Sequence, residues 1–102
     1  MVVSTQKKGE TLYCALEGEL DHHAAGEVRQ RLDKLLQDGS VRNMVLDLSQ
    51  VNFMDSSGIG VLLGRYKTLQ KRGGRLALAH AKPAVDRILE MSGIYRVLQR
   101  LA

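Results

Sequence analysis

The stretch FMDSSGIG, residues 53–60, joins two different patterns of hydrophobic residues. The spacing predicts that this stretch leads from the end of an apolar strand into an amphipathic helix. Ser56 and Ser57 then stand at an exposed corner, beside the Asp55 carboxylate and the unpaired N–H groups of a first helical turn. Because these donors and the helix dipole favour an anion, a serine there is well placed to carry a phosphate. We interpret the stretch as a switch.

The segment after this corner predicts a helix that ends at Gly73 and Gly74. Its apolar residues recur at three- and four-residue steps on one stripe: Ile59, Leu62, Leu63, Tyr66 and Leu69. Gly60 and Gly64 share another face, and each costs a helix about 1 kcal/mol relative to Ala. We therefore expect this glycine face to approach the sheet or a partner closely.

Four segments predict strands, and the third of them is the strand that precedes the corner. They are residues 2–6 and 11–17, joined as a hairpin around Gly9, and residues 44–48 and 75–79. Residues 96–101 are compatible with a last strand or with a frayed terminus.

Two more segments predict helices. Apolar residues recur helically over residues 25–36, with Asp21 as the expected N-cap and Gly39 as the expected stop. Residues 82–91 follow, with Pro83 in the first turn and Gly93 just beyond the end. The order β-β-α-β-α-β-α-β indicates a small α/β domain.

Length and composition predict one domain, 1–102, with an aliphatic core. The 102 residues include 44% hydrophobic residues, one Phe and no Trp. Cys14 alternates with Leu12 and Leu16, which favours a buried strand position over a reactive thiol. The sequence shows no signal-peptide pattern and no spanning segment, so we expect a cytoplasmic location without membrane contact.

Charge is distributed unevenly along the chain. Residues 1–54 carry six Lys or Arg against eight Asp or Glu, whereas residues 55–102 carry nine against three. Nucleic acid is one possible partner for a basic half. We favour a simpler interpretation, in which a solvated helix face and the turn after it carry Arg65, Lys67, Lys71, Arg72 and Arg75. With Tyr66 as the one aromatic among them, we expect no direct nucleic-acid partner.

Enzymatic and metal sites are weakly supported. The serine elbow Gly-x-Ser-x-Gly of hydrolases is absent, because Met54 stands two residues before Ser56. Gly64 falls one residue late for a dinucleotide motif after Gly58 and Gly60. His22 and His23 are adjacent and point differently, which makes them a poor metal pair. We expect no enzyme activity, cofactor or metal.

Several motifs together resemble STAS domains of the anti-sigma factor antagonist type, and the sporulation type in particular. They are GELDHH at 18–23, FMDSSGIG at 53–60, LGRYK at 63–67, PAV at 83–85 and MSG at 91–93. The resemblance covers nearly the whole chain and implies a STAS fold, with a small mixed sheet and helices packed on it. Because the family often has a further C-terminal helix, that layer is expected to be absent or supplied by another chain.

The resemblance also implies a phosphorylation switch. The unphosphorylated protein would bind an anti-sigma factor that is also a serine kinase, with its ATP or ADP, and so release the sigma factor. Phosphorylation of the serine after the motif's Asp, here Ser56, would end binding, and a serine phosphatase would reset it. Ser57 would be a helix-start residue or secondary acceptor. The implied partner-binding residues are Asp21, Asp55, Ser57, Gly58, Gly60 and Arg65.

Two alternatives stay open from the residues. Serines at a helix start are often only caps, and Asp55 is equally at home as a turn or cap residue. A domain with the same switch is also compatible with another phospho-signalling complex, such as a stressosome, that does not act on a sigma factor.

Overall fold

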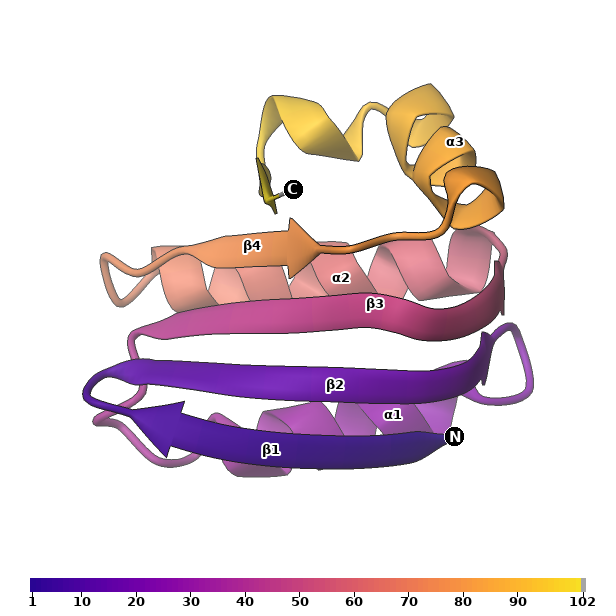
Figure 1. Ribbon diagram of the computed structural model, residues 1–102. Helices are drawn as coiled ribbons and strands as arrows, with labels where there is room; N and C mark the ends of the chain where they lie inside the picture. Colours follow the sequence, from indigo (N-terminus) through magenta and orange to yellow (C-terminus); the bar gives the residue numbers. More distant parts are fainter. Residues whose placement is uncertain (102) are drawn as a thin grey trace.

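The fold begins with a β-hairpin and then alternates helices and strands, as the sequence order predicts (Figure 1). The computed structural model describes residues 1–101. Its elements are β1 (Val2–Lys8), β2 (Thr11–Leu20), α1 (Ala25–Leu35), β3 (Asn43–Met54), α2 (Ser56–Gln70), β4 (Leu76–Ala79), α3 (Pro83–Ser92), the 3₁₀ turn η1 (Ile94–Arg96) and β5 (Gln99–Leu101).

The strands form one mixed sheet in the order β1-β2-β3-β4-β5. β1 and β2 are antiparallel, and the remaining neighbours are parallel. The hairpin loop consists of Gly9 and Glu10, because Lys8 pairs with Thr11. Gly9 has a φ of +60°, which a two-residue hairpin loop requires and glycine adopts without strain. The predicted hairpin is confirmed.

β3 is longer than the predicted strand at 44–48. It continues to Met54, which pairs with Leu20 at the end of β2. Polar residues Ser49, Gln50 and Asn52 interrupt its apolar pattern, so the sequence alone did not indicate the extension. Pairing with β2 continues past these residues, with shifts in register between Ala15 and Leu20.

Helices α1 and α2 cover one face of the sheet, behind the strands in Figure 1. Leucine, valine and methionine side chains fill the space between helices and sheet. Those less than 2% exposed include Leu16, Leu20, Leu32, Met44, Leu46, Leu48, Met54, Leu62 and Leu69. Cys14 belongs to this core, and burial raises the pKa of its thiol to about 11. The aliphatic core and the buried cysteine are confirmed.

α1 covers the predicted residues 25–36 except the last, but the expected N-cap and stop residues are wrong. The N-cap residue is Ala24, without a side-chain cap, and Asp21 instead caps the turn before the helix. The helix ends at Leu35, before Gly39, and a turn leads to β3. Asp21 cannot cap α1 because residues 22–24 form that intervening turn.

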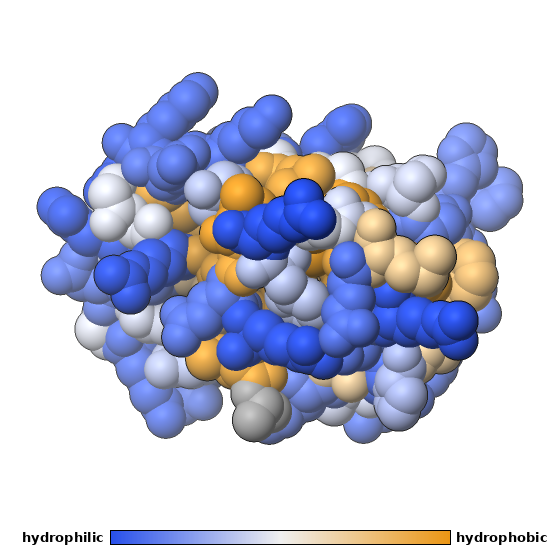
Figure 2. All heavy atoms as spheres, turned by 90° about the horizontal axis from the view of Figure 1, so that it is seen from above, coloured by the Kyte–Doolittle hydropathy of each residue, from blue (hydrophilic) through white to orange (hydrophobic). Residues whose placement is uncertain are grey.

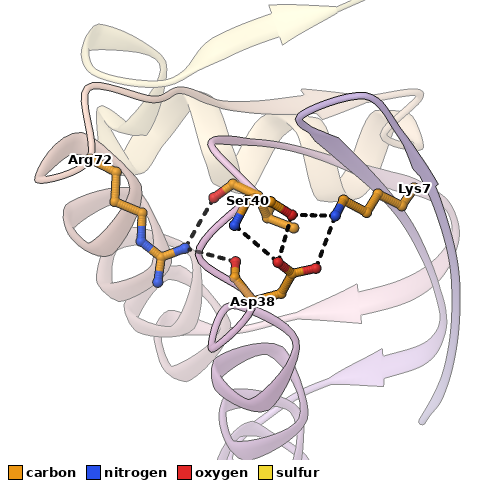
Figure 3. Close-up of polar contacts among 5 residues, drawn as sticks. Lys7, Asp38, Ser40 and Arg72 are labelled. Carbon is orange, nitrogen blue, oxygen red and sulfur yellow. Dashed lines mark hydrogen bonds and ion pairs between the residues drawn. The ribbon is translucent and has the colours of Figure 1, made fainter.

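Polar contacts hold the loop after α1 (Figure 3). The Asp38 carboxylate accepts hydrogen bonds from Lys7 of β1 at 3.0 Å and from the Ser40 hydroxyl at 2.6 Å. Arg72, just beyond α2, donates to the Val41 carbonyl at 3.0 Å and to the Leu36 carbonyl. The loop is therefore tied to both β1 and the end of α2.

The predicted single solvated face of basic residues is wrong. Arg65 is buried between the two helices, and Arg72 is half-buried with its guanidinium group on backbone carbonyls. Lys67, Lys71 and Arg75 are exposed. α2 packs against α1 on one side. Some of these basic residues therefore make contacts within the protein, and the others are exposed to solvent.

The C-terminal third contains the predicted helix α3. It also shows which of the two alternatives for residues 96–101 is correct, a last strand or a frayed terminus. Pro83 lies in the first turn of α3, and Gly93 caps its end with a φ of +79°. The end of the chain forms η1 and then a short strand, β5. Figure 2 looks onto this side and shows apolar surface interrupted by charged side chains. Met91 and Val97 are among the exposed large apolar residues of the chain. Among the described residues, no helix is long and apolar enough to cross a membrane.

Candidate functional site

The candidate site lies where β2 and β3 end side by side. Because these strands are parallel and Leu20 pairs with Met54, Asp21 and Asp55 leave the sheet at the same edge. The backbone N–H of Asp55 also points to the Leu20 carbonyl, at 3.5 Å. The two motifs at 18–23 and 53–60 therefore meet in space. We call the residues 21–23 and 55–58 the switch corner.

Asp55 holds the switch corner together. It is the N-cap of α2, and its Oδ1 accepts the Ser57 N–H at 2.9 Å. Its Oδ2 accepts the His22 N–H at 3.1 Å from the neighbouring loop. Partial desolvation raises the pKa of Asp55, but the N–H groups of His22, Ser57 and Gly58 together outweigh it and hold that pKa below its usual value. Asp55 is thus an ionised clamp between two loops.

Asp21 shapes the other loop of the corner. Its Oδ1 accepts the N–H groups of His23 and Ala24, both at 3.0 Å. Its carbonyl accepts the N–H groups of Ala24 and Ala25. The carboxylate therefore fixes the turn that presents His22 and His23.

Neither serine is the cap of α2. Ser56 is the first residue of the helix and is exposed, whereas Ser57 is the second and is partly buried. Asp55 performs the capping for which the serines were candidates. The Ser56 side chain is left facing solvent at the start of the helix.

Gly58 allows α2 to start close to the sheet. A Cβ atom on Gly58 would lie 2.7 Å from the Met54 side chain and 2.8 Å from the Leu20 carbonyl oxygen. Gly60 and Gly64 face open space, because a Cβ there meets nothing within 4 Å. The glycine needed for packing against the sheet is therefore Gly58, and the expected close approach of Gly60 and Gly64 to the sheet is wrong.

A family model for the STAS domain matches residues 2–101. The chain belongs to the STAS domain family. An anti-sigma F factor antagonist of Paenibacillus polymyxa is 44% identical over 85% of this chain and 74% of its own. An anti-sigma-B factor antagonist of Bacillus subtilis is 27% identical over 94% of this chain and 86% of its own.

Solved structures give the same fold. The unphosphorylated anti-sigma factor antagonist SpoIIAA superposes with a TM-score of 0.77 at 27% identity, over 99% of this chain and 88% of that one. SpoIIAA of Bacillus in the phosphorylated form gives 0.75 at 29% identity, over 99% and 92%. The predicted STAS fold is confirmed.

In this STAS domain, Arg65 lies apart from the exposed surface of the switch corner. It is 7% exposed, and its Nε lies 2.9 Å from Asp33 Oδ1 on α1. The contact is an ion pair without hydrogen-bond geometry, since Nε and Nη1 of Arg65 lack a partner among residues 1–101. Burial lowers the pKa of Arg65, Asp33 opposes this, and Arg29 adds to it. Arg65 sets how α2 packs on α1.

The corner of the STAS domain includes two features that sequence reasoning missed. The His22 N–H contacts Asp55 across the loops, and Phe53 is 48% exposed at the end of β3. The sequence indicated Asp55 as a turn or cap residue, but not that its carboxylate would bind a backbone N–H of another loop. Among residues 1–101, no group of three or more His, Cys, Asp or Glu side chains is placed to hold a metal ion.

Proposed function

We propose that this STAS domain is an anti-sigma factor antagonist whose binding is switched off by phosphorylation of Ser56. The relatives that share its sequence over most of its length are anti-sigma factor antagonists. The observation that carries the switch is the capping of α2 by Asp55, which leaves the Ser56 hydroxyl exposed. The partner is an anti-sigma factor serine kinase with bound ATP or ADP, and a serine phosphatase restores the active form.

The partner surface includes the switch corner and the outward face of α2. Ser56, Gly60 and Gly64 lie at four-residue steps on that helix, so they share one face. The open space over both glycines permits close approach of another chain. Asp21, Asp55, Ser57 and Gly58 support this surface through the loops they hold. Arg65 contributes indirectly, through the placement of α2 on α1.

Phosphorylation would act on the complex rather than on the fold. It adds about −1.5 to −2 charges, and a helix start tolerates that charge because its dipole is positive there. Next to Asp55, and against a kinase that holds an anionic nucleotide, the same charge opposes binding. A tenfold loss of affinity needs only about 1.4 kcal/mol. No rearrangement of the domain is required.

The test is intact-mass spectrometry after incubation with the anti-sigma factor kinase of the same organism and ATP. We expect one added phosphate in the natural protein and in Ser57→Ala, and none in Ser56→Ala. The natural protein should then lose kinase binding by at least tenfold in a titration of the purified partners. Phosphate on Ser57 alone, or equal binding before and after phosphorylation, would contradict the proposal.

An active kinase that adds no phosphate would point to a different phospho-signalling complex. The same kinase preparation should modify a known substrate in parallel, so that a negative result is attributable to this chain.

A further inference from the structure

A pair of histidines stands on the loop of the switch corner that contacts the loop carrying Ser56. The His22 N–H bonds to the side chain of Asp55, the residue directly before Ser56. His23 lies beside it, with the two imidazole centroids 5.0 Å apart in an edge-to-face arrangement. His22, His23 and Ser56 are all exposed.

The corner lacks the cations that usually bind phosphate. Residues 9–28 and 43–64 contain no Lys or Arg, although the chain has fifteen of them. On these two segments, His22 and His23 are the side chains that can become positive. The Asp55 carboxylate is turned to N–H groups of both loops.

We propose that the imidazole groups of His22 and His23 form the phosphate-binding side of the switch corner when Ser56 is phosphorylated. This inference rests on the proposed function. A phosphoserine carries about −1.5 to −2 charges at pH 7, and a positive charge beside it favours the dianion. A protonated ring nitrogen donates a charge-assisted hydrogen bond to a phosphate oxygen.

Several other charged groups surround the corner. Glu19, Asp21, Glu27 and Asp55 are acidic and oppose the dianion, while Lys82 comes from the connection between β4 and α3. The Lys82 ammonium group donates to Asn52 at 2.6 Å, which holds it at the neighbouring strand. Without the imidazoles, the acidic residues would raise the second pKa of the phosphate, so that the dianion would form at a higher pH.

The test uses full-length protein with phosphoserine installed at position 56 by genetic code expansion, so that no kinase is needed. The phosphorus NMR signal is followed from pH 4.5 to 8.5 in the natural background and in His22→Gln, His23→Gln and the double variant. We expect the midpoint of the phosphate titration to rise by about half a pH unit in the double variant, from the loss of nearby positive charge. His80→Gln is the matched control and should leave the midpoint unchanged.

Equal midpoints in the natural and double-variant proteins would overturn the inference, as would a shift as large in His80→Gln. Circular dichroism of each variant shows whether the fold is retained, and the His22 N–H contact to Asp55 survives because it is a backbone group. Failure of the kinase to modify Ser56 refutes the proposed function by a separate measurement. A midpoint shift with no kinase activity would leave a phosphate-binding corner without that switch.

Discussion

At the residue scale, the environment of a side chain decides whether it serves stability or chemistry. Asp55 and Ser56 are neighbours, yet the carboxylate is engaged by two loops while the hydroxyl faces solvent. The difference arises because the Asp55 backbone is extended and its side chain folds back over the helix start. The capping residue thereby frees the next residue for modification.

Asp38 gives a pH-dependent prediction at this scale. Hydrogen bonds from Ser40 and then Lys7 lower the pKa of Asp38 to about 2. Because the folded-state value lies below the ordinary value of 3.8, Asp38 stabilises the fold above about pH 4, and this contribution disappears as the pH falls towards 2. Urea unfolding should show Asp38→Asn as less stable than the natural protein at pH 6, with a smaller difference at pH 2. Gln37→Asn, an exposed control without a titratable side chain, should show little change of its difference with pH, and a constant Asp38→Asn difference would contradict the prediction.

At the element scale, the α1–α2 contact buries the positive charge of the Arg65 guanidinium group, and some of its nitrogens have no hydrogen-bond partner among the described residues. Asp33→Ala would leave the Arg65 guanidinium buried without its ion pair. Because Asp33 is about half exposed, we expect a loss of about 1–2 kcal/mol rather than the larger value of a fully buried pair. In an Arg65→Met background, Asp33→Ala should be nearly neutral. A double-mutant cycle measured by urea unfolding tests this, and purely additive losses would exclude the coupling.

Substitutions at two glycines of α2 should have different effects, one on kinase binding and the other on the stability of the fold. Gly60→Ala should stabilise the domain by about 0.5–1 kcal/mol, because Ala is the better helix former and its Cβ meets open space. The same change should weaken binding of the anti-sigma factor kinase, because the added methyl group keeps the partner chain farther from the surface of α2. Gly58→Ala, two residues earlier, should destabilise the fold because its Cβ meets Met54 and Leu20. Thermal unfolding and a kinase titration measure both effects, and unchanged kinase affinity in Gly60→Ala would remove this face from the interface.

At the scale of the whole molecule, the connection that leads into β3 and the connection that leads into β4 pass close to each other at the amino ends of these strands. A Cβ on Gly74 would lie 1.6 Å from the Arg42 carbonyl oxygen, a backbone atom just before β3. Gly74→Ala must therefore separate β4 from β3 locally, and we expect a loss of at least about 3 kcal/mol or failure to fold. Gly39→Ala, whose Cβ meets nothing within 4 Å, is the matched control and should change stability by less than about 0.5 kcal/mol. Similar urea midpoints for the two variants would refute the close crossing.

The sequence by itself determined the order of the elements, the hairpin at Gly9, the aliphatic core and the place of the strand-to-helix corner. These follow from short-range rules: hydrophobic periodicity, glycine and proline at turns, and burial of aliphatic side chains. It also singled out Asp21, Asp55 and Ser56, although not how they interact. Periodicity carries no information about contacts between residues thirty positions apart.

Only the tertiary structure decided which residues meet across loops. Asp55 binds the His22 N–H because parallel pairing of β2 and β3 aligns Leu20 with Met54. Arg65 is buried because α1 lies against that side of α2. Hydrophobic periodicity does not predict the burial of an arginine. Gly58 is closed because it lies against Leu20 and Met54, whereas Gly60 and Gly64 lie on a face of α2 that meets no other described element. Each outcome depends on packing between elements, which follows from the summed burial of the core rather than from any local sequence.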